Sequence, residues 1–271
     1  MATLFDALLH TARALEALHE SVATGGSTTT IIDNRLSALG WVADDFDQGT
    51  AFWIRDANGS AGSQSRIVSD FNLTGSGTIA VESAFSATIE TADNYGVMTR
   101  RYTRGLLVSK INEALQELGE IESFTDIVST GALEYALAAT FKRIARIIAG
   151  NTTTTPQAWT RIPTYQHAEG RLLFKTAPAS GNTIRIYYYA NHAAVYADAD
   201  AINPDINIDW LGMAASVKCA RWRLGQPGAD QRAQTALLND LMSREGGIRA
   251  RRLRWRPNSI TNVFPTGYPE T

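Results

Sequence analysis

Residues 183–192 read TIRIYYYANH, residues 197–209 read ADADAINPDINID, and residues 246–257 read GGIRARRLRWRP. The first stretch is a tyrosine-rich strand, because tyrosine and β-branched residues favour the extended backbone. The second is an acidic turn that leads into two short helices, and the third is an arginine-dense tail. This order of elements comes without a catalytic motif. It predicts a structural module with a cationic arm, and it favours assembly with other chains over turnover.

The charge is divided unevenly along the chain. The 271 residues carry a formal net charge of -2, yet residues 244–256 contain six arginines and one glutamate, which gives +5. The remainder holds 19 cationic against 26 acidic side chains, a net of -7. An acidic body with a basic tail suits docking of the tail on a neighbouring acidic surface.

Composition limits the class of protein. With 44% hydrophobic and 19% charged residues, the chain is of ordinary folded composition and long enough for one large domain or two smaller ones. The single cysteine, Cys219, excludes an intramolecular disulfide and a multi-cysteine zinc site. Residues 1–23 have apolar residues at helical spacing but carry four charges, unlike a signal peptide or a membrane span. We expect a protein that is made in the cytoplasm and has no membrane partner.

Hydrophobic periodicity predicts helices and strands in the first half of the chain. A helical pattern runs from Leu4 to Val22, with a capping box of Thr3 and Asp6 at its start and glycines 25–26 at its end. The polar and acidic residues 27–47 then resemble a linker. Period-two patterns predict strands at 51–56, 65–73, 77–85 and 94–100, and a helix follows over 102–118 that stops at Gly119.

Short strands return in the second half. They are expected at 123–129, 132–138, 141–149, 157–163, 171–176 and 183–190, with a hairpin loop at 152–155. Six strands at such spacing suggest a sandwich or a roll. Two helices are expected last, at 208–224 and 229–244. Acidic residues begin the first of them, and basic residues, Gly225 and Pro227 end it, as helix-dipole and capping rules require.

Together these elements predict an α+β chain with a helical core. Its expected parts are helical core elements at 1–47 and 100–122, an inserted antiparallel β-unit at 48–99, a β-sheet module at 123–192, a C-terminal helical hairpin at 193–246 and an extended arm at 247–271.

Motifs for catalysis or cofactor binding are lacking. The glycine-rich strings GGSTTT and GSGT have no lysine of a phosphate-binding loop, and the four histidines show no metal-ligand spacing. Cys219 lies inside a helical pattern, where a small buried hydrophobe is the simpler interpretation than a nucleophile. No catalytic, cofactor-binding or metal site is therefore predicted, and the chain is not expected to be an enzyme.

The tail is the candidate site. Residues 252–256 alternate cationic and apolar side chains at strand period, so one side could dock while the other presents guanidinium groups. The candidate docking residues are Arg249, Arg251, Arg252, Leu253, Arg254, Trp255, Arg256, Phe264 and Tyr268. Arginine binds carboxylates and phosphates alike, so a nucleic-acid backbone is an alternative partner, and a plain solvated terminus is a second alternative.

Several stretches resemble a known family. They are GGSTTTIID at 25–33, ADDFDQGTAFWI at 43–54, SRIVSDFN at 65–72, GTIAVESAF at 77–85, INEALQELGEI at 111–121, LEYALAATFKRI at 133–144, GNTIRIYYYANHAAVYADADAI at 181–202 and ARWRLGQPGADQRAQTALLNDL at 220–241. In the order of these stretches and in their residue character, the chain resembles a tailed-bacteriophage head-to-tail adaptor, or neck connector, over most of residues 24–245. It departs at Tyr135-Ala-Leu-Ala138, where a proline would complete a YxLP strand start.

The resemblance implies a structural virion protein and no cofactor. Copies would form a homo-oligomeric ring, a dodecamer, that joins the portal protein to tail or nozzle proteins in the neck of the virion and surrounds the DNA exit channel. Contact with the passing DNA is possible in that position. Two alternatives stay open: another tail or neck ring component of the tail-tube or terminator type, and a nucleic-acid-binding module that uses the basic tail.

Overall fold

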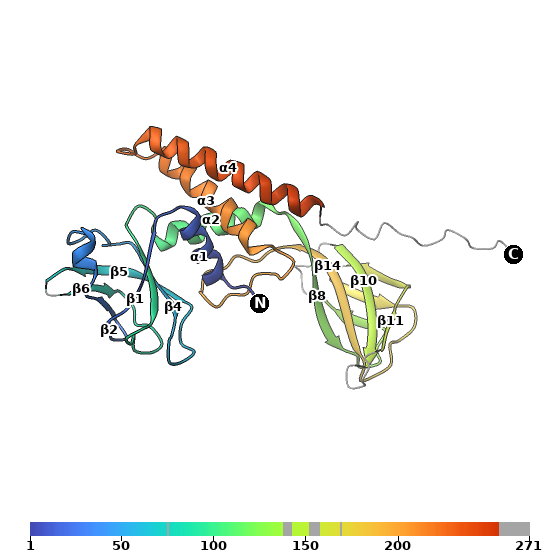
Figure 1. The fold of residues 1–271 in the computed structure, drawn as a ribbon. Helices are drawn as coiled ribbons and strands as arrows, with labels where there is room; N and C mark the ends of the chain where they lie inside the picture. The colour runs from blue at the N-terminus through green and yellow to red at the C-terminus, as the bar shows by residue number, and fades with distance from the viewer. Residues whose placement is uncertain (75, 138–142, 152–157, 169, 255–271) are drawn as a thin grey trace. The chain divides into compact units, whose positions relative to one another are not determined.

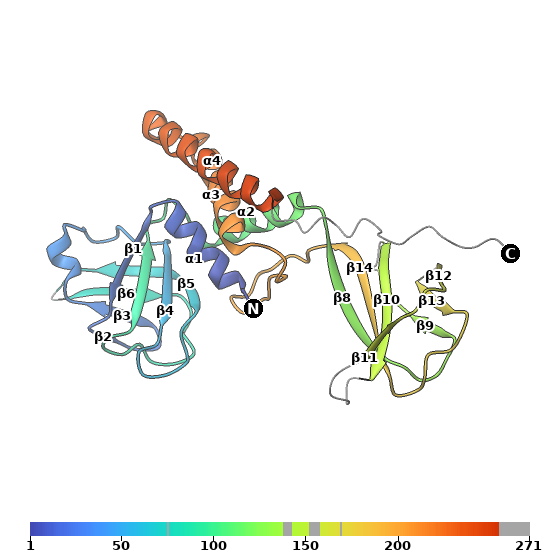
Figure 2. The same ribbon diagram turned by 45° about the vertical axis from the view of Figure 1, so that its right-hand side comes forward.

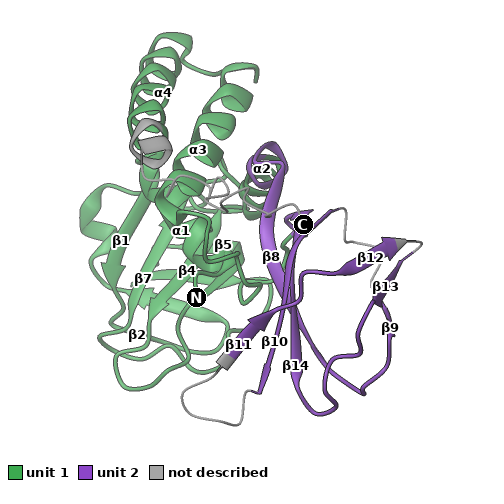
Figure 3. Ribbon diagram, turned by 90° about the vertical axis from the view of Figure 1, so that its right-hand side faces the viewer, with its two compact units in different colours: residues 1–113, 195–271 green, residues 114–194 purple. Residues whose placement is uncertain are grey.

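A computed structural model describes residues 1–74, 76–137, 143–151, 158–168 and 170–254, and it divides into two compact units (Figure 3). Unit 1 comprises Met1–Glu113 and Val195–Thr271, and unit 2 comprises Ala114–Ala194. The described residues form four α-helices and several antiparallel sheets, so the fold is α+β as the sequence predicts.

Among its described residues, unit 1 begins with a helix, continues with seven short strands and ends in two long helices (Figure 1). Its elements are α1 (Leu4–Ala14), β1 (Leu18–Val22), β2 (Gly25–Gly26), β3 (Thr30–Asp33), the 3-10 turn η1 (Leu36–Leu39), β4 (Thr50–Arg55), β5 (Gln64–Asn72), β6 (Gly77–Val81), β7 (Asn94–Met98), α3 (Ile208–Leu224) and α4 (Gln231–Arg254). Helix α2 (Arg104–Glu117) begins in unit 1 and crosses into unit 2.

The sheet of unit 1 curls into a roll. Its seven strands follow the order β1-β7-β4-β5-β6-β3-β2 and pair antiparallel throughout. The two edge strands, β1 and β2, are separated along the chain by only Ala23 and Thr24. Two residues span at most about 10 Å between their neighbours, so the edges must come together. The backbone N–H of Ala23 donates to Asp93 O at 2.8 Å and that of Thr24 to Ile32 O at 2.7 Å, so the chain passes from the β7 side to the β3 side of the sheet without losing its hydrogen bonds.

Apolar side chains at alternate positions of the strands fill the interior of the roll. Trp53 and Tyr95 are fully buried in its core, and Trp53 meets Phe85 edge to face at 5.7 Å between ring centroids. On the outer side of β4, Phe52 meets Phe5 of α1 at 6.1 Å. Strand β4 is therefore buried on both faces, which is why its sequence, TAFWIR, is apolar almost throughout.

Helix α1 carries the predicted capping box. The backbone N–H of Thr3 donates to Asp6 Oδ2 at 2.8 Å, and the backbone N–H of Asp6 donates to Thr3 Oγ1 at 3.4 Å. The helix packs on α3 at Gly212, where an added Cβ would lie 2.6 Å from His10 Cβ. The absence of a side chain at Gly212 thus permits a close helix crossing.

Helices α3 and α4 form the predicted hairpin (Figures 1 and 2). Asn207 caps α3 by accepting a hydrogen bond from the backbone N–H of Trp210 at 2.9 Å. Asp209 lies in the first turn and two arginines lie in the last, as the helix dipole favours. Gly225 follows as the C-cap, so the predicted bounds of this helix are confirmed.

Unit 2 consists of two sheets around one core. Its strands are β8 (Glu120–Val128), β9 (Glu134–Ala136), β10 (Arg143–Asn151), β11 (Ala158–Arg161), β12 (Tyr165–Ala168), β13 (Arg171–Phe174) and β14 (Thr183–Asn191). One sheet has the order β11-β10-β14-β8 and the other β12-β13-β9. Ile147, Ile184 and Ile186 of the first sheet share a core with Tyr135, Leu172 and Phe174 of the second, as a sandwich requires. The predicted hairpin loop at 152–155 lies outside the described residues.

Two expectations for the first 47 residues are wrong. The helix predicted to reach Val22 ends at Ala14, because Glu16 adopts a positive φ of 53° that a continuing helix does not allow. The following residues form β1, β2 and β3 of the roll and not a linker. The β-unit therefore extends well beyond the expected 48–99.

The C-terminal boundary also needs correction. The second helix of the hairpin does not stop near Arg244, because α4 continues through the glycine pair to Arg254. Residues 247–254 of the expected extended arm are thus helical. The rest of the arm, residues 255–271, lies outside the described residues.

Candidate docking surfaces

The arginine-rich segment predicted to dock lies at the end of α4. Arg249, Arg251, Arg252, Leu253 and Arg254 all belong to this helix, and Arg249 is exposed. The strand-like alternation expected for residues 252–256 does not hold over residues 252–254, because these residues are helical. Trp255, Arg256, Phe264 and Tyr268 lie outside the described residues.

The middle of α4 anchors this helix end to α3. Leu238 and Leu241 are buried, and Trp210 Nε1 of α3 donates to Glu245 Oε1 at 3.0 Å. Beyond this contact come Gly246 and Gly247, both exposed and with no atom within 4 Å of an added Cβ. The arginine-rich turns therefore extend from a fixed hairpin.

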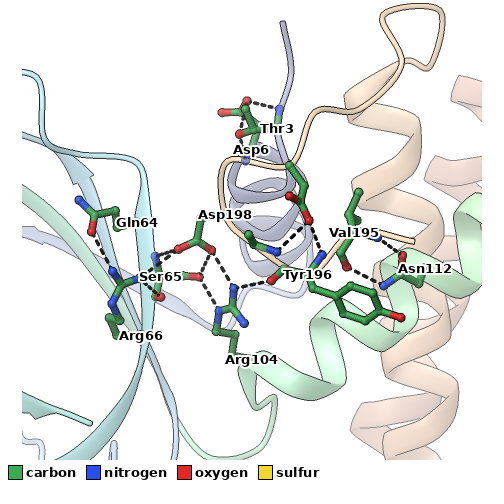
Figure 4. Close-up of polar contacts among 12 residues, drawn as sticks. Thr3, Asp6, Gln64, Ser65, Arg66, Arg104, Asn112, Val195, Tyr196 and Asp198 are labelled. Atoms are coloured by element: carbon green, nitrogen blue, oxygen red, sulfur yellow. Dashed lines mark hydrogen bonds and ion pairs between the residues drawn. The ribbon is translucent and has the colours of Figure 1, made fainter. Parts of the chain in front are cut away.

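An ionic cluster at Asp198 ties the base of the hairpin to the roll (Figure 4). The Asp198 carboxylate, only 11% exposed, pairs with Arg66 of β5 at 3.2 Å and with Arg104 of α2 at 3.0 Å. It also accepts the backbone N–H of Ser65 at 2.7 Å. The backbone oxygens of Asp198 and Asp200 accept from Phe5 and Leu4 of α1, at 3.0 and 2.9 Å.

These contacts give the acidic turn a structural role. Asp200 accepts the backbone N–H groups of Tyr196 and Ala197, which lowers its pKa. Asn112 of α2 holds Val195 through two hydrogen bonds of 2.9 Å each. Sequence reasoning recognised a turn here but not the cluster, because Arg66 and Arg104 are far from it along the chain.

A second exposed surface lies on unit 2, on the outer face of the four-stranded sheet. Strand register places its side chains in rows across β8, β14 and β10. The rows are Glu122, Tyr189 and Arg143, then Phe124, Tyr187 and Arg146, then Asp126, Arg185 and Ile148. We call these residues, with Trp159 of β11, the arginine–aromatic face.

Guanidinium groups lie over the rings of this face. Arg143 lies 4.4 Å from the ring centroid of Tyr189, and Arg146 lies 4.0 Å from that of Tyr187. Arg185 lies 4.4 Å from Phe124 and 4.8 Å from Trp159. Such contacts hold the arginines in place at little further entropic cost.

Carboxylates of β8 complete the arrangement. Arg185 donates from Nε and Nη2 to the two oxygens of Asp126, both at 2.7 Å, and this pairing raises its pKa. Arg146 lies 3.4 Å from Glu122. The alternation Arg185, Tyr187, Tyr189 was visible in the sequence, but the strands that flank it could not be read there.

Among the described residues outside these two surfaces, we find no group of reactive side chains that forms a catalytic site. Burial raises the pKa of the Cys219 thiol to about 12, so the thiolate is disfavoured and Cys219 is a structural residue. Carboxylate oxygens of Asp44, Asp47 and Asp70 lie within 4.8 Å of one another. Two of these residues are exposed, and acidic side chains gather in this way without a bound ion, so we assign no metal to them. Among the described residues, no helix combines the length and apolar character needed to cross a bilayer.

Comparison with protein-family models and with curated protein sequences finds no match to this chain. The docking surfaces are accordingly interpreted from their own chemistry.

Proposed function

We propose that the chain is a structural subunit of the neck of a tailed bacteriophage, a head-to-tail adaptor that docks on the portal ring and provides a platform for the tail. The resemblance in sequence over most of residues 24–245 supports this role. So does the kind of surface that the molecule exposes, since arginine and aromatic side chains carry most of the binding energy in protein interfaces.

One observation carries the proposal: the arginine-rich segment continues helix α4 directly beyond its anchor on α3. Trp210 and Glu245 fix the helix just before Gly246, and the net charge over residues 244–256 is +5. A segment that is helical before it docks loses less conformational entropy on binding an acidic partner surface than an unfolded tail would. In a ring of copies, the arginine-rich end of each α4 would make the same contact with the partner.

The test is capture of the portal protein by full-length and truncated chains. Deleting residues 247–271 should weaken capture at least tenfold, because it removes five of the six arginines in the charged segment. A second deletion, of residues 255–271 alone, keeps the helical turns of α4 and four of those five arginines. It should retain much of the binding. Full capture of the portal by the chain without residues 247–271 would refute the proposed docking role.

A nucleic-acid-binding module is the second candidate, and the same +5 segment favours it. Binding through phosphates predicts retention of arbitrary duplex DNA that falls steeply as salt rises. The adaptor role predicts no strong retention, because the rest of the chain carries -7. Retention on duplex DNA at low salt, lost on deletion of residues 247–271, would favour the nucleic-acid module.

A further inference from the structure

The arginine–aromatic face is an outer sheet surface with the composition of an interface. Its inner side is the core of unit 2, whereas Phe124 on the outer side remains 54% exposed. Aromatic rings and arginines dominate the hot spots of protein–protein interfaces. Phe124 is covered by Arg185 and meets Tyr187, yet it stays exposed enough to contact a partner protein.

The geometry favours carboxylates over a nucleic acid. The faces of Tyr187 and Tyr189 are already covered by guanidinium groups at 4.0 and 4.4 Å, so bases cannot stack on those faces without displacing them. Glu122 and Asp126 on the same face repel phosphates. Arg185 binds the two carboxylate oxygens of Asp126 at 2.7 Å each. This pair shows that the arginines of the face can bind carboxylates in bidentate geometry. Among the described residues, Arg143 has no such carboxylate partner.

The chain itself offers an acidic surface of matching character. Unit 1 outside residues 244–256 and the final tail carries 12 cationic against 19 acidic side chains, a net of -7, whereas unit 2 carries seven against six, a net of +1. Within unit 1, residues 39–47 together with Asp70 form what we call the acidic corner. Leu39 is 54% and Val42 61% exposed, and both lie a few residues before the clustered Asp44 and Asp47 along the chain.

The acidic corner holds closely spaced carboxylates whose repulsion the charge of Arg100 offsets only in part. Asp47 Oδ1 is buried without a hydrogen-bond partner, and burial together with the charges of Asp44 and Asp70 raises the Asp47 pKa. An arginine brought to this point would relieve the repulsion, while Leu39 and Val42 could pack on exposed apolar groups such as Phe124.

We propose that the acidic corner of one copy of this chain docks on the arginine–aromatic face of the next copy. Each copy uses both surfaces once, so the contact is head to tail and closes into a ring if the rotation permits. The inference rests on the proposed function in so far as an adaptor works as a ring of copies, but it concerns the contact between copies and not the contact with the portal.

Two neutralising variants of the full chain test the contact. The face variant combines Arg143→Ser with Arg146→Ser, and the corner variant combines Asp44→Asn with Asp70→Asn. Asparagine suits the positive φ of 68° at Asp44, so the loop should keep its conformation. Matched controls are Arg171→Ser in the other sheet of unit 2 and the exposed Asp205→Asn in unit 1.

Sedimentation velocity over a rising concentration series at low salt gives the readout. The wild-type chain should associate beyond a dimer, the controls should match it, and each variant alone should associate at least tenfold more weakly. An equimolar mixture of the two variants should form a 1:1 dimer and stop there, because one intact face meets one intact corner and both remaining surfaces are disabled.

Other outcomes overturn the inference. They are a wild-type chain that stays monomeric throughout, variants that associate as the wild type does, and a mixture that forms no dimer. Retention of single-stranded DNA by the wild type but not by the face variant would make the face a nucleic-acid platform instead.

Portal capture is measured separately. If capture depends on residues 247–271 while the mixture fails, only the contact between copies is wrong; if the dimer forms without portal capture, only the adaptor role is wrong.

Discussion

Asp33 carries a charge where three strands of the roll meet. Its carboxylate is fully buried and accepts hydrogen bonds from Ser21 Oγ of β1 at 2.7 Å, from Tyr95 Oη of β7 at 2.9 Å and from Arg35 Nε at 2.8 Å. Burial alone would raise the pKa of Asp33, but the hydrogen bonds from Arg35, Ser21 and Tyr95 outweigh it and lower the pKa to about 2. Burial raises the pKa of the Tyr95 hydroxyl, and the neighbouring charge of Asp33 raises it further.

The lowered pKa makes the stability of unit 1 depend on pH in a defined direction. A carboxyl group with a depressed folded pKa stabilises the fold above its ordinary pKa, and that contribution is lost as pH falls from about 4 through about 2. At neutral pH it amounts to about 2 kcal/mol. Asp33→Asn should therefore lower the free energy of unfolding by about that amount at pH 7, measured by urea denaturation.

The pH series supplies the control for this substitution. The gap between wild type and Asp33→Asn should shrink as the pH approaches 2, because the wild-type carboxyl is then protonated as well. Glu82→Ala, at an exposed site of unit 1, should change stability by less than about 0.5 kcal/mol at either pH. A gap of the same size at pH 7 and at pH 2.5 would show that charge is not the cause.

At the scale of elements, α4 continues through Gly246 and Gly247, although the sequence predicted that the helix ends just before them. Each glycine costs a helix interior about 1 kcal/mol relative to alanine, and neither site would hinder an added Cβ. Gly246→Ala with Gly247→Ala should therefore strengthen the last turns of α4. Hydrogen exchange at the amides of residues 248–254 should slow by at least tenfold.

Gly228 offers the matched control in the turn before α4. It has a φ of +73°, a region that residues with a side chain rarely adopt, although its surroundings are open. Gly228→Ala should destabilise the hairpin by about 1 kcal/mol and speed exchange in α4. If the alanines at 246 and 247 also sped exchange, the helix would not continue through the glycine pair.

The elements also show what the sequence could and could not predict. Strong periodicity correctly predicted the strands of residues 50–98, most strands of the sandwich and the first helix of the hairpin. The short strands β1 to β3 were missed because Leu18 and Val22 continue a helical spacing, and the helix is broken by Glu16 and not by a glycine. Strand β12 was missed because YQHA lacks a clear strand pattern.

The docking surfaces illustrate the same limit. Charge along the chain was enough to find the arginine-rich end of α4, whereas its helical state depended on packing through Leu238, Leu241 and Trp210. The arginine–aromatic face depends on strand order, since Phe124 and Arg146 meet Tyr187 only through pairing across the sheet. Residue spacing carries no information about such long-range register.

At the scale of the whole molecule, unit 2 is an insertion whose two ends are paired. Glu120 at the start of β8 lies opposite Asn191 at the end of β14, and Gln116 Nε2 donates to His192 O at 3.3 Å. Its core shares no residue with that of the roll. A chain whose entry and exit strands are adjacent can lose the insertion with little change in loop geometry.

Replacing residues 121–190 by Asn-Gly should therefore leave a folded unit 1. The dipeptide forms a two-residue hairpin turn between the paired residues Glu120 and Asn191. We expect a soluble chain with one cooperative thermal transition by circular dichroism. Removing only residues 121–151 is the control, because it leaves β14 without both neighbours and should give aggregation. Loss of cooperative unfolding in the first chain would show that unit 1 depends on unit 2.

The closure of the roll has a consequence for behaviour at high local concentration. An open sheet presents unpaired N–H and C=O groups on which a strand of another molecule can pair, which leads to fibres or strand exchange. In unit 1 the outermost strands, β1 and β2, are covalent neighbours through Ala23 and Thr24, and both linking amides are hydrogen-bonded. One continuous segment thus serves both ends of the sheet, which leaves less free strand edge for backbone pairing between crowded copies.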